Sequence, residues 1–114
     1  MVSSLHTRGK IGDTLFHLAA AYGHINIIYW MNSIGGIVNS VNIYGQTPAH
    51  IAAKRIQINI LKYLYYDLDV DLLQEDFNGQ IPLDYVPKQD MYGNEKDLIE
   101  TRLFLINIFN NDSY

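Results

Sequence analysis

The sequence predicts an all-α fold, built in one domain as a stack of repeated helix-turn-helix units. Three observations support this. The segment GDTLFHLAAAYGHINIIYW, which starts at Gly12, returns as GQTPAHIAAKRIQINILKY at Gly45, 33 residues later. A third start, NGQIPLDY, brings Gly79 into the same register after 34 more residues. Between these turn residues, apolar side chains recur at helical spacing.

Each repeat begins with a turn glycine, because glycine adopts a positive φ at little cost. A threonine able to cap a helix follows in the first two repeats, and a proline that a first helical turn tolerates follows in the second and third. These residues are Gly12, Gly45 and Gly79 for the turns, Thr14 and Thr47 for the caps, and Pro48 and Pro82 for the first turns.

The first helix of each unit carries a pair of small residues, Ala19-Ala20 and then Ala52-Ala53. Such a thin helix face lets a neighbouring helix approach closely. Gly23 interrupts the first unit, and a second helix is expected after it. The apolar residues of that helix follow i, i+1, i+4, i+7 spacing from Ile27, the pattern of a half-buried helix.

The unit resembles the ankyrin repeat. The core motif of that family, Gly-x-Thr-Pro-Leu-His-x-Ala-Ala followed by Gly-His, appears here as GDTLFHLAAAYGH and GQTPAHIAAKRIQ. The resemblance covers about residues 5–85. It implies an ankyrin-repeat solenoid in which β-turn fingers project at a right angle from stacked helix pairs. It also implies a concave face that binds other proteins.

About three repeats are expected, near residues 9–41, 42–75 and 76–109, within a single domain spanning 1–114. Pro87 and Gly93 predict an inserted loop at about 87–96, after which the outer helix of repeat three closes the stack. Phe104 and Leu105 make that helix apolar enough to face a missing neighbour. The chain is expected to be a piece of a larger protein, with a small stand-alone adaptor as the alternative.

His17 and His24 stand seven residues apart, a spacing that a metal pair or an acid/base pair could use. However, His17 recurs in register as His50. The resemblance implies that His17 and His50 tie their helices to a neighbouring finger, and that His24 opens the second helix. A zinc site needs three or four converging ligands, so no metal and no cofactor is expected.

The pattern breaks in two places. Ile56-Gln57 stand where Gly23-His24 stand in repeat one, and a β-branched residue is a poor choice for a left-handed conformation. Farther on, DLDVDLLQED carries one extra residue and lacks the Gly-Ala usual in the family, so a bulged loop is expected. Its alternating aspartates resemble the start of a calcium loop, but Leu72 and Asn78 replace the required glycine and glutamate. A solvated acidic loop is therefore preferred.

Composition narrows the classes of function. The net charge of -4 argues against nucleic acid as the main partner. The absence of cysteine removes disulfides, thiolate metal sites and cysteine nucleophiles. No run approaches a membrane span, and a cytoplasmic or nuclear protein that does not insert into membranes is expected.

A partner protein or peptide is expected to bind at the variable finger tips and on the inner face of the first helices. The candidate positions, carried over from the resemblance, are Lys10, Ile11, Asp13, Ala21, Tyr22, Ile43, Tyr44, Gln46, Lys54, Arg55, Phe77, Asn78 and Gln80. Aromatic residues and arginine favour an interface, although isolated apolar residues are also ordinary on surfaces.

The leading hypothesis is a protein-binding scaffold without catalysis. A regulatory or substrate-recruiting module of a larger enzyme or membrane protein, acting in cis or by self-association, would use the same surface. A hydrolase using His17 or His50 with Asp13 or Asp84 is the third possibility. No nucleophile elbow, phosphate-binding loop or metal signature supports an enzyme.

Overall fold

The computed structural model describes residues 11–89 and 94–112. These residues form helices and connecting loops, with no strand among them. In chain order the helices are α1 (Leu15–Tyr22), α2 (Ile25–Ser33), α3 (Pro48–Lys54), α4 (Ile58–Tyr66), α5 (Pro82–Tyr85) and α6 (Glu95–Asp112). Residues 90–93 of the expected inserted loop lie outside the described residues.

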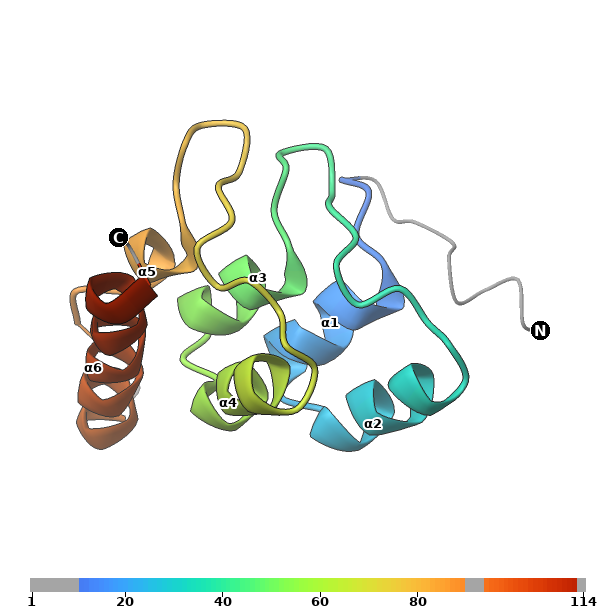
Figure 1. The fold of residues 1–114 in the computed structure, drawn as a ribbon, viewed down its shortest axis with the longest axis horizontal. Helices are drawn as coiled ribbons and strands as arrows, with labels where there is room; N and C mark the ends of the chain where they lie inside the picture. The colour runs from blue at the N-terminus through green and yellow to red at the C-terminus, as the bar shows by residue number, and fades with distance from the viewer. Residues whose placement is uncertain (1–10, 90–93, 113–114) are drawn as a thin grey trace.

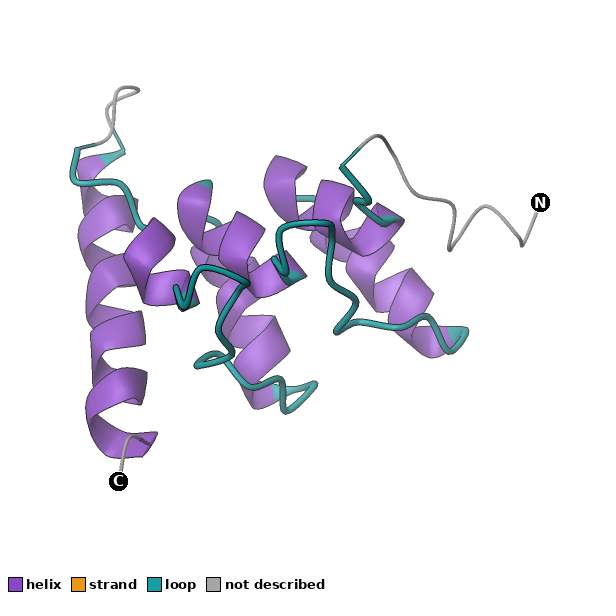
Figure 2. Cartoon of the chain, turned by 90° about the horizontal axis from the view of Figure 1, so that it is seen from above, coloured by secondary structure: helices purple, strands orange, loops and turns teal. Residues whose placement is uncertain are grey.

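Three helix pairs stand side by side, and long loops project from one edge of the stack (Figure 1). The inner helices α1, α3 and α5 pack in a row, and each is followed by an outer helix, α2, α4 or α6, that packs against it. Seen from above, the same pairs lie next to one another in sequence order (Figure 2). The all-α solenoid predicted from the repeats is confirmed.

Small side chains between the inner helices allow this close stacking. Ala20 of α1 and Ala52 and Ala53 of α3 have no exposed surface. Larger apolar residues such as Phe16 and Leu61 fill the space between the inner and outer rows. Because each pair buries its apolar stripe against the next pair, one continuous core runs through the stack.

A threonine and a histidine together build the start of each of the first two inner helices. The Thr14 N–H donates to His17 Nδ1 at 3.1 Å, and the His17 N–H donates back to Thr14 Oγ1 at 3.4 Å. Thr47 and His50 repeat this reciprocal pairing at the start of α3. These bonds occupy N–H groups that no helical carbonyl can reach.

The far side of each histidine ring reaches the finger of the next repeat. His17 Nε2–H donates to the Gln46 carbonyl at 2.7 Å, and His50 Nε2–H donates to the Gln80 carbonyl at 2.9 Å. Both rings are therefore neutral, with the proton on Nε2. Burial lowers the pKa of His50, against the opposing effects of the Gln80 carbonyl and the nearby carboxylates of Asp76 and Asp84.

The junction between α3 and α4 is strained. Ile56 has φ of 59°, in the left-handed region where Gly23 sits in the preceding repeat with φ of 73°. The Ile56 side chain is half-buried, which offsets part of the strain. Next to it, the side chain of Gln57, the residue that precedes α4, donates to the Ala21 carbonyl at 3.2 Å and so links the start of α4 to the end of α1.

The extra residue of repeat two lies in the turn after α4. In the first unit the Gly36 N–H donates to the Met31 carbonyl, five residues back. In the second unit the Val70 N–H reaches the Leu64 carbonyl, six residues back. Asp69 takes φ of 55° in this turn, a conformation that aspartate tolerates better than most residues.

Helix α6 corrects one expectation. Leu105 faces the core and is 2% exposed, together with Leu98 and Ile108 on the same side of the helix. Phe104 is half-buried and packs edge-on against Tyr65, with ring centroids 5.9 Å apart. The apolar residues left exposed on α6 are Ile99, Leu103 and Phe109. The buried face of α6 differs from the one expected from the sequence, because α6 packs against both α4 and α5.

We expect His50→Ala to lower the free energy of unfolding by about 1–3 kcal/mol, because the buried His50 ring joins the start of α3 to the Gln80 carbonyl and its removal breaks both contacts. Since the folded state lowers the pKa of His50 below its ordinary value of 6.5, the unfolded chain takes up the proton first as the pH falls. Stability should therefore decrease from pH 7 towards pH 5 in the wild type, and less steeply in His50→Ala.

Urea denaturation across this pH range measures both effects. His24→Ala is the matched control, because His24 is exposed and makes no side-chain capping bond. A stability of His50→Ala equal to that of His24→Ala would contradict the structural role.

We expect Ile56→Gly to raise the free energy of unfolding by about 0.5–1 kcal/mol, because relief of left-handed strain exceeds the loss of a half-buried side chain. Ile56→Ala separates the two effects, because it removes the same contacts but keeps a Cβ in the strained conformation. Thermal unfolding should rank glycine above isoleucine and isoleucine above alanine. Glycine ranking lowest would show that packing outweighs strain.

Candidate functional site

An asparagine or aspartate holds each described finger in shape. The Oδ1 atom of Asn42 accepts the N–H groups of Tyr44 and Gln46 at 2.9 and 3.0 Å. Asp76 Oδ1 accepts those of Asn78 and Gln80, both at 2.9 Å. The sequence reasoning missed Asn42 and Asp76. Each stands three residues before a finger glycine, and this shared register is the signal that would have found them.

Neighbouring fingers are joined near their tips. The Ile43 N–H donates to the Ile11 carbonyl, and the Phe77 N–H donates to the Tyr44 carbonyl, each at 3.0 Å. A Cβ placed on Gly45 would lie 2.6 Å from the Phe77 ring and 2.7 Å from its backbone nitrogen. The Phe77 side chain therefore lies over the glycine of the preceding finger, as Ile43 lies over Gly12.

Ile43 and Phe77 thus support the finger row as well as being partner candidates. They nevertheless remain 58% and 72% exposed. Tyr44, 48% exposed, has no such covering role, because only its backbone takes part in the finger-to-finger bonds. Contacts between fingers account for Ile43 and Phe77 at the tips, but they do not account for the exposed Tyr44 side chain.

A polar network crosses the base of the fingers. Asn42 Nδ2 donates to Asp13 at 3.0 Å and to the Gln46 side chain at 2.7 Å. Gln46 Nε2 donates to the Tyr85 hydroxyl at 2.9 Å, and that hydroxyl donates to Asp76. Burial acts to raise the pKa of Asp76, but the bonds from Tyr85 and from the finger backbone outweigh it and lower the pKa. This network makes the fingers a connected row.

A hollow of about 260 Å³ lies where the first two fingers meet the inner helices. Leu18 and Ile51, which the sequence reasoning did not select, lie among the residues that line it. The sequence-predicted residues that it brings together are Ile11, Asp13, Ala21, Tyr22, Tyr44, Gln46, Lys54 and Arg55.

The other candidate positions lie elsewhere. Ile43 and Phe77 lie over the finger glycines, and Asn78 and Gln80 are exposed residues of the third finger. Lys10 lies outside the described residues.

Two cations stand at the helix end of the hollow. The Arg55 guanidinium lies 5.7 Å from the centre of the Tyr22 ring, within the range of a cation–π contact. Neither Lys54 nor Arg55 has a carboxylate partner within residues 11–89 and 94–112. At the finger end, Asp13 is held by Asn42. The hollow therefore has opposite charges at its two ends and apolar residues between them.

Residues 32–86 match the family model for ankyrin repeats (many copies). This part of the chain carries ankyrin repeats. It is also similar to Alpha-latrotoxin-Lhe1a of Latrodectus hesperus, with 31% identity over 84 residues, which covers 73% of this chain. The chain spans 6% of the length of that protein.

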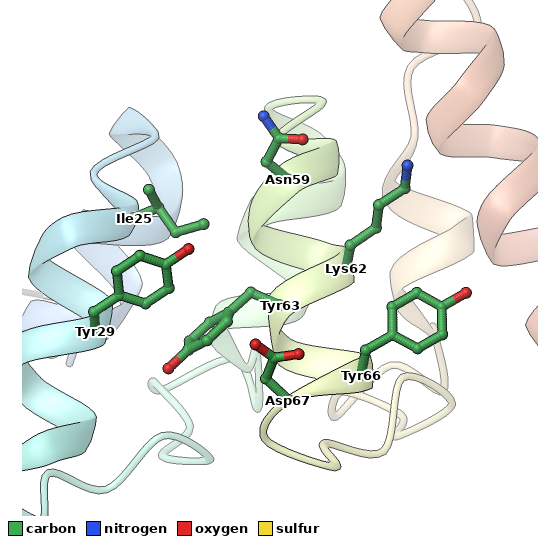
Figure 3. A pocket seen from close by; sticks show the side chains of 7 residues that line it. All are labelled: Ile25, Tyr29, Asn59, Lys62, Tyr63, Tyr66 and Asp67. Atoms are coloured by element: carbon green, nitrogen blue, oxygen red, sulfur yellow. The ribbon is translucent and has the colours of Figure 1, made fainter.

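A second, larger hollow of about 420 Å³ lies on the opposite, outer side of the ankyrin stack, between α2 and α4. Tyr29 and Tyr63 pack edge to face there, with ring centroids 4.5 Å apart, and Figure 3 shows Asp67 between Tyr63 and Tyr66. Burial and the Asp67 carboxylate raise the pKa of Tyr63. Lys62 extends away from the tyrosine pair and meets Glu100 of α6 at 2.9 Å. This outer hollow was not predicted from the sequence.

Two hollows are found on the described residues, one on each side of the stack. Across residues 11–89 and 94–112, no group of three or more His, Cys, Asp or Glu side chains is placed to hold a metal ion. No helix in the same ranges is both long and apolar enough to cross a membrane. His17 and His50 are 1% and 0% exposed, so both rings are enclosed by the fold.

We expect Gly45→Ala to destabilise the domain by more than Gly79→Ala, by at least about 1 kcal/mol. Both glycines have nearly the same φ, 76° and 78°, so the left-handed cost is shared. At Gly45 the new methyl group would overlap Phe77, which costs further free energy. At Gly79 the nearest atom lies 3.7 Å away, so the new methyl group meets no clash. Equal losses in thermal unfolding would contradict the proposed packing of Phe77 on the preceding finger.

Proposed function

We propose that this domain is a scaffold without catalysis that binds another protein or peptide through its concave face and finger tips. Ankyrin repeats are in general protein-interaction modules. The observation that carries the finer proposal is the inner hollow, where the exposed side chains of Tyr22, Tyr44 and Arg55 gather. Tyrosine and arginine are the residue types that dominate the centres of protein interfaces.

The hydrogen bonds of the histidines support binding over catalysis. A general base must reach a substrate, but each motif histidine already uses both ring nitrogens within the stack. His17 and His50 hold the finger row in place, and the finger row in turn presents Tyr44. Their contribution to function is therefore to the shape of the surface.

A second candidate is a regulatory or recruiting module of a larger protein, acting in cis or by self-association. It is favoured by the exposed Ile99, Leu103 and Phe109 on α6, at the end of the stack where a further repeat would pack. The similar protein from Latrodectus hesperus, of which this chain spans 6%, is also much longer than this chain. Both candidates would present the same concave face.

We expect Tyr44→Ala to weaken partner binding by tens of fold, because truncating a central aromatic residue of an interface costs about 2 kcal/mol or more. The melting temperature should change little, because the Tyr44 side chain is about half exposed and covers neither Gly12 nor Gly79. Affinity capture from source cells supplies the partner, and isothermal titration calorimetry then measures Kd for each variant.

Tyr66→Ala is the matched control for this measurement. It removes an exposed tyrosine from the outer helix α4 and should leave Kd unchanged. If binding ignored Tyr44 but were abolished by changes at Leu103 and Phe109, the exposed end of the stack would be the functional surface.

A further inference from the structure

We propose that the inner hollow recognises an extended peptide segment that carries one carboxylate and, about three residues away, one large apolar side chain. The carboxylate pairs with Lys54 and Arg55, and the apolar side chain packs between Ile11 and Tyr44. This inference rests on the proposed function and adds the chemistry of the partner.

The charge of the hollow differs from that of the protein as a whole. The chain has a net charge of -4, yet Lys54 and Arg55 stand together at the helix end of the hollow. Within the described ranges neither side chain has a carboxylate partner. Two adjacent cations without a counter-charge favour an anionic group from a partner.

Arg55 is held in a position suited to such a group. Its guanidinium lies over the Tyr22 ring at 5.7 Å, which limits the side-chain freedom that binding would otherwise remove. A cation–π contact does not use the guanidinium N–H groups that point away from the ring. Those N–H groups match the two oxygens of a carboxylate, which favours arginine in this place over a single ammonium.

The inner helices set the spacing between the two contacts. α1 and α3 pack together, with Leu18 and Ile51 lining the middle of the hollow between the finger base and the helix ends. At 1.5 Å per residue, the 7 residues of α3 extend over roughly 10 Å. An extended peptide covers that distance in about three residues, at about 3.3 Å each.

The finger end of the hollow rejects a second carboxylate. Asp13 lies there, held by Asn42, and would repel an acidic side chain placed beside Ile11 and Tyr44. The exposed apolar parts of those two residues favour an aliphatic or aromatic group instead. A uniformly acidic peptide should therefore bind less well than one with a single carboxylate at the cationic end.

The outer hollow, between α2 and α4, shows no comparable preference for a charged partner. Its lining includes both the Lys62 ammonium and the Asp67 carboxylate, as Figure 3 shows, and Lys62 is already paired with Glu100. Charge at that surface therefore selects neither an acidic nor a basic partner.

Selection from a random dodecapeptide display library against the full chain tests the inference. The selected peptides should be enriched in Asp or Glu about three positions from a large apolar residue. With the best synthetic peptide, Arg55→Gln should weaken binding about tenfold or more at low salt, as expected for a lost charge-assisted contact. Added salt should weaken wild-type binding more than that of Arg55→Gln.

Lys96→Gln is the matched control, because Lys96 is an exposed cation on α6, outside the hollow. Its Kd should equal that of the wild type. A copy of the peptide with its carboxylate residue changed to lysine should not bind. Because Arg55 and Lys96 are both exposed, neither substitution should change the melting temperature. That measurement excludes a folding defect as the cause of any change in Kd.

The outcomes separate this inference from the proposed function. Peptides that need Tyr44 but lack acidic residues and ignore Arg55→Gln would overturn the acidic chemistry and leave the concave scaffold standing. Failure to select any peptide would overturn this inference alone, because a folded protein partner could still use the concave face. Peptides that bind but ignore Tyr44 and Arg55 alike would overturn both.

Discussion

The hydrogen bond from a buried histidine to the backbone of the next finger is the contact on which the rest of this structure depends. His17 and His50 are each fixed at a helix start by a threonine, and each then donates to a carbonyl in the following repeat. One ring thereby satisfies a helix terminus and sets the position of a loop about one repeat away. Because a buried ring N–H left without an acceptor costs free energy, the helix row and the finger row cannot move independently.

The same coupling explains why the fingers form a regular row. Asn42 and Asp76 close their own turns, while Ile43 and Phe77 bond to the preceding finger and cover its glycine. These contacts use backbone groups and the side chains at two equivalent positions of each finger. Tyr44 takes part in them only through its backbone, and its side chain lines the hollow at the foot of the row. A stable finger row and an exposed tyrosine side chain at its tip are therefore consistent with each other.

The concave face carries local charges of opposite sign at the two ends of the inner hollow, although the protein as a whole is acidic. The cations at the end of α3 and the carboxylate at the base of the first finger lie at opposite ends of the hollow, with apolar side chains between them. Such an arrangement contributes more to selecting and orienting a partner than to raw affinity. The affinity would come from the aromatic and aliphatic surface that a partner covers.

The sequence by itself determined the repeat, the helix starts, the inner alanine faces and the awkward junction at Ile56, because each depends on residues close together in the chain or on strict recurrence. Tertiary structure alone decided that Leu105 is buried while Leu103 is exposed, since α6 contacts two helices that the local pattern cannot specify. It also decided that Phe77 packs on Gly45 and that the outer hollow forms between α2 and α4. Those features join residues from different repeats, and a periodic sequence does not encode the distance between them.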